Sequence, residues 1–309
     1  MNDYIEDLLK NHKLFKIICG TGNEFPKEIE YISYIYTLAG ANMIDISADT
    51  ESIKSCIRGI KKANVEKKPI INVSIGIKGD PHIRKIIINK DLCINCGECK
   101  RVCNQKAITQ NIKVISKRCI GCGICYGACK IGAISFYDNL KDYKKILPKF
   151  LKMGVETFEL HASTTDIESS LEKLEYLNSL TPNNFIGLCL DRTVLSNSQI
   201  YDIVKKSYNL IGDRLIIQAD GVPMSGTDDT YNTTLQTVAC ADIIRKSKIP
   251  VYIILSGGTN SKTISLSKLC NVEYNGISIG SWARKIVRES KNKEEALSLA
   301  KELVNYGIN

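Results

Sequence analysis

Two short cysteine runs with the same spacing constrain this chain more than any other feature. The first is Cys93-Ile-Asn-Cys96-Gly-Glu-Cys99-Lys-Arg-Val-Cys103, and the second is Cys119-Ile-Gly-Cys122-Gly-Ile-Cys125-Tyr-Gly-Ala-Cys129. Both read C-x2-C-x2-C-x3-C, the spacing of bacterial two-cluster ferredoxins. Zinc sites instead use four ligands in two C-x2-C pairs. The runs therefore predict two [4Fe-4S] clusters, rather than a zinc site or a reduced cysteine-rich loop.

The fourth cysteine of each run is expected to bind the cluster that the other run holds. One predicted ligand set is Cys93, Cys96, Cys99 and Cys129. The other is Cys119, Cys122, Cys125 and Cys103. The proline that usually follows the fourth cysteine is replaced by Asn104 and Lys130, which loosens the loop exit but removes no ligand.

The remaining cysteines are scattered through the chain: Cys19, Cys56, Cys189, Cys240 and Cys270. They fall on expected strands, helices or their ends, where a free cysteine behaves as a small hydrophobe, so we predict that they bind no cluster. With 13 cysteines and no secretory signal, the composition indicates metal binding in the cytoplasm and not a disulfide framework. No apolar run is long enough to span a bilayer.

The net charge of +9 is spread along the whole chain. Two oxidised clusters would lower it to roughly +5. Because the basic residues form no block and are not interleaved with aromatic ones, we expect no nucleic-acid partner.

Outside the cysteine runs, apolar stretches of strand length alternate with helical ones. The expected strands are 14–20, 43–47, 69–76, 157–163, 184–191, 214–221, 251–258 and 276–281. Helices are expected in the gaps, for example at 26–39, 139–153, 231–246 and 293–306. Eight strands, each followed by a helix, predict a (β/α)8 TIM-like barrel of the α/β class. A doubly wound open sheet is the alternative.

The cysteine runs interrupt this pattern after the third strand. We expect a barrel formed by residues 1–82 and 139–309, with a bacterial-type 2[4Fe-4S] ferredoxin module inserted at 83–138. An insert at this point is a loop between a strand and its helix, on the barrel face where active sites are built. The clusters are therefore expected beside the barrel mouth.

Several expected strands alternate polar and apolar residues, which is unusual for strands buried on both faces. Because the outer face packs on helices, the polar side chains are predicted to face the lumen: Lys16, Asp45, Glu159, His161, Asp191 and Asp220. Charged groups are costly to bury dry. The set indicates a ligand pocket, with a hydrated salt-bridge network around Lys16 as the alternative.

Glycine-rich turns follow the last two expected strands. Gly257-Gly258-Thr259-Asn260 follows the seventh, and Gly280-Ser281 follows the eighth and opens a helix. Many barrels bind phosphate there through backbone N–H groups and a helix N-terminus. We predict a site for FMN or another phosphate-bearing ligand, with Asp220 and Lys16 contacting the rest of it. A third loop, Pro223-Met224-Ser225-Gly226, is expected at the same mouth.

Nearly the whole chain resembles the cyanobacterial light-dependent period protein family, which comprises iron–sulfur proteins implicated in redox input to the circadian clock. Besides both cysteine runs, the segments that carry the resemblance are 15–20, 36–41, 45–49, 80–85, 220–226, 257–260 and 280–285. The resemblance implies a two-cluster redox sensor or carrier and no defined reaction.

Two functions follow from these observations. The first is electron transfer or redox sensing through the ferredoxin module, with a redox partner protein. The second is an oxidoreductase in which the clusters feed a flavin or a small-molecule substrate at the barrel mouth. Flavin absorbance bands in anaerobically purified protein would favour the second.

Overall fold

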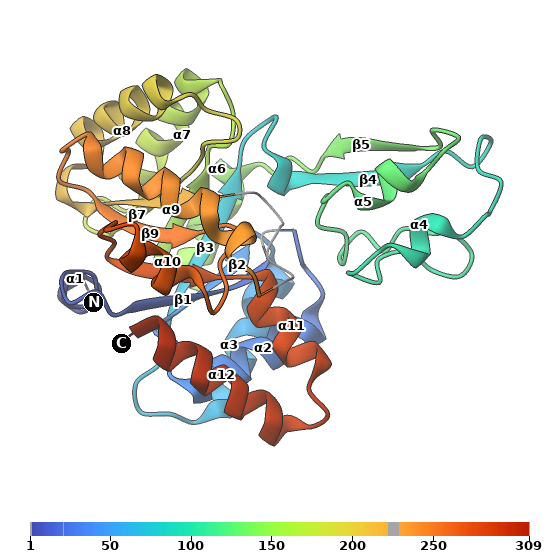
Figure 1. The fold of residues 1–309 in the computed structure, drawn as a ribbon, viewed down its shortest axis with the longest axis horizontal. Helices are drawn as coiled ribbons and strands as arrows, with labels where there is room; N and C mark the ends of the chain where they lie inside the picture. Colours follow the sequence, from blue (N-terminus) through green and yellow to red (C-terminus); the bar gives the residue numbers. More distant parts are fainter. Residues whose placement is uncertain (1, 21, 222–228, 309) are drawn as a thin grey trace.

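Eight parallel strands close into a barrel in the computed structural model, which describes residues 2–20, 22–221 and 229–308 (Figure 1). Around the barrel the order is β1-β10-β9-β8-β7-β6-β3-β2. The strands are Leu14–Gly20 (β1), Met43–Ser47 (β2), Ile70–Gly76 (β3), Thr157–His161 (β6), Ile186–Asp191 (β7), Leu215–Asp220 (β8), Tyr252–Ser256 (β9) and Gly276–Ile279 (β10). The predicted TIM-like barrel is confirmed, and the open sheet is excluded.

Helices follow the barrel strands in sequence and cover their outer face. They are Pro26–Ala39 (α2), Thr50–Ala63 (α3), Tyr143–Lys152 (α6), Ile167–Leu180 (α7), Asn197–Ile211 (α8), Tyr231–Lys246 (α9), Thr263–Leu269 (α10), Ser281–Glu289 (α11) and Lys293–Ile308 (α12). Two 3-10 turns, Pro81–Ile83 (η1) and Gly212–Arg214 (η2), complete the barrel connections.

Local sequence sets where these helices begin and end. Asp49 caps α3 by accepting a hydrogen bond from the backbone N–H of Ser52, and Ser196 and Gln199 form a reciprocal capping box at α8. Helix α2 ends at Gly40, whose φ of 92° is left-handed. These caps fix the C-terminus of α2 and the N-termini of α3 and α8.

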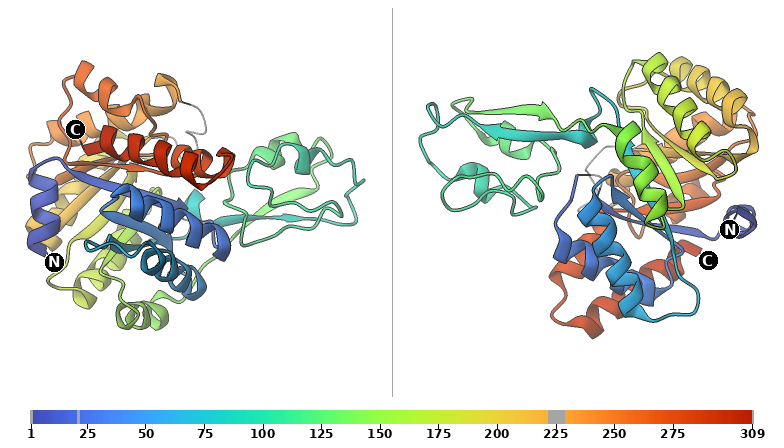
Figure 2. Two further views of the ribbon diagram at one scale, coloured as in Figure 1. Left: turned by 90° about the horizontal axis from the view of Figure 1, so that it is seen from below. Right: turned by 180° about the vertical axis from the view of Figure 1, so that it is seen from behind.

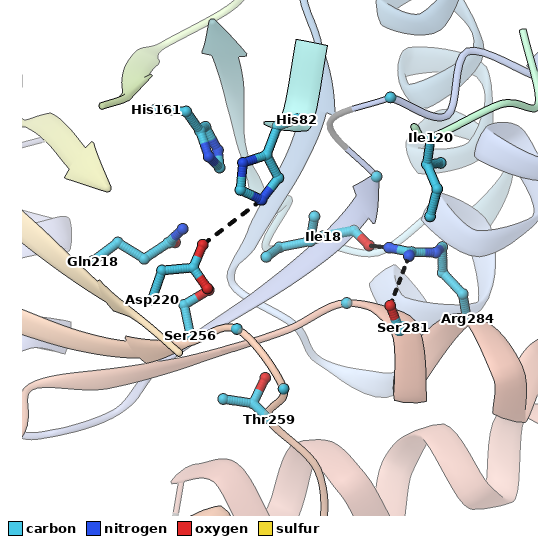
Figure 3. Close-up of a pocket in the computed structure, with 15 residues that line it drawn as sticks. Ile18, His82, Ile120, His161, Gln218, Asp220, Ser256, Thr259, Ser281 and Arg284 are labelled. Carbon is cyan, nitrogen blue, oxygen red and sulfur yellow. Dashed lines mark hydrogen bonds and ion pairs between the residues drawn. The ribbon is translucent and has the colours of Figure 1, made fainter. Parts of the chain in front are cut away.

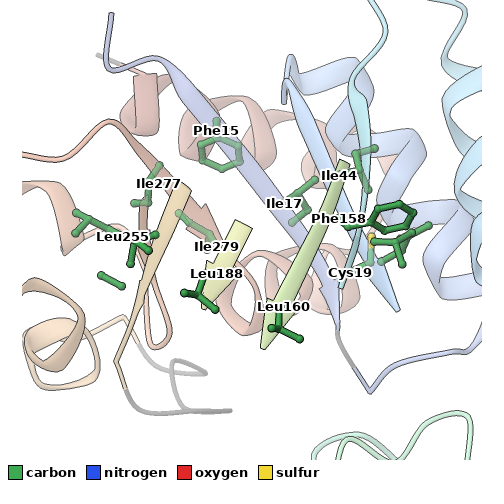
Figure 4. Close-up of a cluster of buried hydrophobic side chains, with 14 of the residues drawn as sticks. Phe15, Ile17, Cys19, Ile44, Phe158, Leu160, Leu188, Leu255, Ile277 and Ile279 are labelled. Atoms are coloured by element: carbon green, nitrogen blue, oxygen red, sulfur yellow. The ribbon is translucent and has the colours of Figure 1, made fainter. Parts of the chain in front are cut away.

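Apolar side chains from strands and helices form one large core between the barrel wall and its covering helices. Figure 4 shows Phe15, Ile17, Phe158 and Leu188 among the members of this cluster, all fully buried. These residues alternate with the polar positions of the same strands. The alternation therefore places apolar residues outward, against helices, and polar residues inward.

A short N-terminal helix, Asn2–Lys10 (α1), lies at the barrel end opposite the cysteine module (Figure 2). Ile5, Leu8 and Leu9 of α1 join a second apolar cluster that includes Met43 and Ile70 from the strand beginnings. This helix was not expected from the sequence. It closes the bottom of the barrel, so the lumen opens toward the module.

Between β3 and α6 the chain forms a separate unit that projects from the barrel (Figures 1 and 2). Strands Arg84–Ile88 (β4) and Ile134–Asp138 (β5) pair antiparallel, and two short helices, Glu98–Arg101 (α4) and Ile124–Ala128 (α5), lie between them in sequence. A third apolar cluster, containing Ile86, Ile108 and Ile134, packs with the cysteines. None of the helices in the described ranges is both long enough and apolar enough to cross a membrane.

Candidate functional site

The two cysteine loops have the same backbone course. Gly97 (φ 82°) precedes α4 and Gly123 (φ 83°) precedes α5, and each adopts the left-handed conformation that starts its helix. At Gly121 a Cβ atom would lie 2.1 Å from the Arg84 carbonyl oxygen, so a side chain cannot be accommodated there. The sequence repeat is thus a structural repeat, with glycine where the loops turn most tightly.

The thiols of the loops fall into two groups of four. One group lines a cavity of about 20 Å³ and consists of Cys93, Cys96, Cys99 and Cys129. Burial raises the pKa of Cys99, and the other three thiols of that group raise it further. Burial likewise raises the pKa of Cys125 to about 12, with further contributions from Cys122, Cys103 and Cys119. Cys99 and Cys125 therefore have as neighbours the thiols that the ferredoxin spacing groups with them, and such a thiolate quartet fits a cubane cluster.

Lys85 connects the second cysteine loop to the barrel. Its Nζ donates hydrogen bonds to the carbonyl oxygens of Gly22 (3.0 Å), Ser116 (2.7 Å) and Cys119 (3.1 Å). Burial lowers the pKa of this amine, although Glu24 lies 3.6 Å away. Because Gly22 belongs to the β1–α2 loop, the loop carrying Cys119 is fixed against the barrel mouth.

The first cysteine loop lies at the surface of the module. Cys96 is exposed, and neighbouring Leu92 and Ile94 are 53% and 68% exposed. Exposed apolar side chains near a cofactor site are typical of a surface that contacts another molecule. The two thiol groups therefore differ in setting, one against the barrel and one facing solvent.

The lower lumen of the barrel holds a buried ion pair surrounded by polar side chains. Lys16 donates to Glu159 across the barrel, and both side chains are at most 3% exposed. Burial alone would raise the pKa of Glu159, but the Lys16 ammonium and the His161 imidazole outweigh it and lower that pKa. Asp45 accepts hydrogen bonds from Asn72 (2.5 Å) and Ser74 (2.6 Å). The inward direction predicted for these polar residues is observed.

Above this network lies a second layer of polar groups at the strand ends. His82 of η1 contacts Asp80 through Nδ1 (2.8 Å), and its Nε2 lies 3.7 Å from Asp220 Oδ2. Cys189 donates through Sγ to the same carboxylate (3.1 Å), and His161 stacks beside His82 with ring centroids 4.4 Å apart. Burial and the nearby carboxylates of Asp220 and Glu159 raise the pKa of Cys189 well above its ordinary value.

A cavity of about 70 Å³ opens above these residues at the barrel mouth (Figure 3). Most residues of the predicted ligand site line it: Asp220, Gly257, Gly258, Thr259, Gly280 and Ser281. Lys16 and Asn260 do not. Lys16 lies lower in the lumen with Glu159, and Asn260 hydrogen-bonds to Thr230 and Thr233. Pro223, Met224, Ser225 and Gly226 lie outside the described residues.

The glycines at the mouth have different structural roles. Gly257 and Gly258 both have positive φ (67° and 72°), as the turn after β9 requires. A Cβ at Gly257 would lie 1.5 Å from Asp220 Oδ1, so glycine there also makes room for this carboxylate. Thr259 donates to the Ser278 carbonyl oxygen (2.5 Å), which fixes the turn to β10.

Three residues at the mouth were not identified from the sequence. Asp80 and His82 precede the module but return to the barrel, and Arg284 of α11 donates to the Ile18 carbonyl oxygen (2.9 Å) and to Ser281 (3.1 Å). For Asp80 and His82, the available signal was the Asp-Pro-His sequence that follows the expected third strand. For Arg284 it was the position three residues after Ser281, one turn into the helix.

Comparison with known families agrees with this geometry. A family model described as the light dependent period A C-terminal domain matches residues 150–306, and one described as a 4Fe-4S binding domain matches residues 86–109 and 112–135. Light dependent period A from Synechococcus elongatus is 28% identical over 257 residues, covering 81% of this chain and 72% of the relative. The chain is thus an iron–sulfur protein with a 4Fe-4S binding domain.

Solved structures similar to the chain share its fold at low sequence identity. The YdjI aldolase from Escherichia coli K12 matches with a TM-score of 0.50 and 10% identity, covering 97% of this chain and 92% of that one. A tryptophan synthase from M. tuberculosis matches with a TM-score of 0.53 and 8% identity, covering 99% and 97%. These likenesses concern the barrel fold alone. The family is shown by the model that matches residues 150–306: the chain belongs to the light dependent period A family.

Proposed function

We propose that this protein transfers electrons through two [4Fe-4S] clusters, from a partner protein at the tip of the module to the barrel mouth. The observation that carries the proposal is the grouping of eight thiols into two quartets. Bound clusters would supply one-electron chemistry at low potential. In this proposal, residues 83–138 form the module, and residues 1–82 and 139–309 form the barrel.

The placement of the two quartets supports a direction for this transfer. Lys85 holds the Cys119 loop against the β1–α2 loop, and Ile120 lines the mouth cavity. The Cys96 loop, with exposed Leu92 and Ile94, faces solvent. A redox partner can therefore approach one cluster without covering the mouth, and the other cluster lies beside the cavity.

Anaerobic reconstitution tests the cluster content. We expect about eight iron and eight sulfide per chain, and reduction by a low-potential donor should bleach the visible absorbance. Rapid mixing with a small ferredoxin or flavodoxin would then measure transfer. A preparation that holds stoichiometric zinc and no sulfide would contradict the proposal.

A second candidate function is an oxidoreductase acting on a small ligand at the mouth. The observation that favours it is a convergence of polar groups on one cavity: Arg284, the N-terminus of α11 and the Gly257–Gly258 turn. A cavity of about 70 Å³ is far smaller than the roughly 300–1,000 Å³ of pockets for drug-sized ligands. The space bounded by the described residues accordingly suits a phosphate group or a small acid better than FMN.

Calorimetric titration separates this candidate from simple electron transfer. Inorganic phosphate, sugar phosphates and FMN should be titrated into holoprotein, with Gly258→Val as the matched variant. A side chain at Gly258, where φ is 72°, is strained and blocks approach to the turn. If phosphate compounds bind the parent but not Gly258→Val while both spectra are equal, the mouth is an anion site. Absence of heat and of thermal stabilisation with every compound would reject it.

A further inference from the structure

We propose that the upper lumen of the barrel binds a divalent first-row transition metal ion through His161, Cys189 and Asp220. This site lies within the barrel, apart from the eight cysteines of the module. It does not depend on the electron-transfer proposal. Imidazole, thiolate and carboxylate together suit zinc and its neighbours in the first row, and a thiolate does not suit magnesium or calcium.

Three consecutive barrel strands bring the ligands together. His161 ends β6, Cys189 lies in β7 and Asp220 ends β8, with His161 paired to Cys189 in the sheet register. One potential ligand atom from each residue lies within 4.8 Å of the other two. The Cys189 Sγ–Asp220 Oδ2 distance is 3.1 Å. Ligand atoms around a tetrahedral zinc ion are separated by about 3.3–3.7 Å, so only small side-chain shifts are needed.

A carboxylate lies beside each of the two histidines at this position. The His161 Nε2–Glu159 Oε1 distance is 3.3 Å, and His161 Nδ1 on the other side of the ring is available to a metal. His82 Nδ1 contacts Asp80 at 2.8 Å, so its Nε2 is directed toward Asp220, 3.7 Å away. A carboxylate on the second nitrogen is the usual support of a metal-binding histidine.

Polar atoms at this position lack partners among the described residues. They are both ring nitrogens of His161, Asp220 Oδ1, and both side-chain polar atoms of Gln218. All three side chains are at most 2% exposed. Buried polar atoms without partners are rare and unfavourable. A cation bound at His161 and Asp220 would satisfy two of them at once.

The charge of the lumen also favours a cation. Asp45, Asp80, Glu159, Asp191 and Asp220 are all buried there, whereas Lys16, which pairs with Glu159, and the histidines His82 and His161 are the basic groups near them. Because a buried charge needs a partner, an added dication lowers the cost of keeping the upper carboxylates ionised. Two of the three proposed ligands, His161 and Asp220, line the mouth cavity together with His82, so a fourth ligand could reach the ion from the cavity. An open position of this kind is typical of catalytic rather than structural zinc sites.

Zinc binding to the reconstituted, full-length holoprotein tests the site. After dialysis against a chelator, equilibrium dialysis with zinc should give about one ion per chain, with unchanged iron and sulfide. X-ray absorption at the zinc edge should show one sulfur among nitrogen and oxygen ligands. A shell of four sulfurs would place zinc at the cluster cysteines and overturn the proposal.

Variants locate the ion. His161→Ala and Cys189→Ser should each weaken zinc binding by more than about 100-fold, because each removes a ligand. The matched control is Cys56→Ala, which removes another fully buried thiol, from α3, and should bind zinc as the parent does. Circular dichroism checks folding, and Asp220→Asn replaces any ligand variant that does not fold.

Two results would overturn the proposal of a metal site in the lumen. One is a parent protein that retains no zinc, because zinc binds an N/O/S site more tightly than manganese, iron or cobalt do. The other is equal zinc affinity in parent, His161→Ala and Asp220→Asn. Failure of cluster assembly with normal zinc binding would instead contradict the electron-transfer proposal alone.

Discussion

The cysteine module and the barrel lumen both concentrate metal-ligand side chains, but they achieve this by opposite routes. The module takes its thiols from two adjacent loops, most of them at least partly exposed, around a small core. The lumen takes His82, His161, Cys189 and Asp220 from distant parts of the chain and buries them all. The cysteine motif can be recognised from the spacing of nearby residues, whereas the lumen residues come together only when the barrel has closed.

The two regions also differ in what keeps them folded. The module has two five-residue strands and helices of four and five residues, too little structure for a stable core by itself. The barrel has a continuous apolar core around all eight strands. Cluster binding should therefore contribute much of the module's folding free energy and little of the barrel's.

Loss of a cluster should give the largest difference between the two regions, because it should change the iron content of the module and not the thermal stability of the barrel. Cys122→Ala should remove about four iron and four sulfide per chain from one quartet, and Cys96→Ala the same number from the other. The barrel should keep its thermal transition in both variants because its core is separate. Iron analysis and calorimetry on the same samples measure both quantities. Complete unfolding of the barrel in either variant would show that the regions are not independent.

Breaking the lumen ion pair should have the converse effect. Lys16→Met leaves Glu159 buried without a counter-charge and should lower the free energy of unfolding of the barrel by about 3–5 kcal/mol. Iron content should stay at the parent value. The matched control is Lys10→Met, which removes an exposed pair with Glu6 and should leave the free energy of unfolding nearly unchanged. Equal destabilisation by the two changes in denaturant titration would argue against a buried pair.

A smaller effect is expected from pH. Burial raises the pKa of Asp45 from 3.8 to about 6, so the folded barrel holds this proton more tightly than the unfolded chain does. Stability from this group is present below about pH 4 and is lost as pH rises through about 6, with a slope of at most about 1.4 kcal/mol per pH unit. Asp45→Asn should flatten the stability profile in that window. Asp242→Asn, on an exposed helix face, should leave the profile unchanged.

The smallest effect should come from a cysteine outside both sites. Cys240→Ala removes a buried thiol that donates to the Leu190 carbonyl oxygen in the outer core. Iron and sulfide should not change, and stability should fall by about 1 kcal/mol from lost packing. Iron loss measured in this variant would mean that the cluster ligands extend beyond the module.

The sequence predicted all eight barrel strands because their apolar runs are long and separated by helical stretches. Strands β1 and β2 match the expected residues, whereas β6, β9 and β10 end before the expected Ser163, Gly258 and Ser281. The chain turns at the mouth there, so the last residues of these predicted strands lie in loops or, at Ser281, begin α11. Helix α1 was missed because its apolar face is only Ile5, Leu8 and Leu9, and its role depends on the closed barrel.

The candidate sites were also predictable to different degrees, because some depend on local sequence patterns and others on the closed barrel. The thiol quartets follow from spacing alone, and the inward direction of Asp220 and His161 follows from strand alternation. The roles of Lys85, His82 and Arg284 depend on how the module and the last helix return to the mouth. Cys189 was expected to be an ordinary core residue; its contact with Asp220 becomes visible only when β7 and β8 are aligned.

The Lys85 bridge has an electrical consequence for the module. Each electron that enters a cluster adds negative charge, and a cation at a fixed nearby position stabilises that charge. Lys85 Nζ lies 3.1 Å from the carbonyl oxygen of Cys119, which in the proposed assignment belongs to the inner cluster. The Lys85 ammonium should therefore raise the reduction potential of the inner cluster, and the Glu24 carboxylate 3.6 Å from it should offset part of that increase.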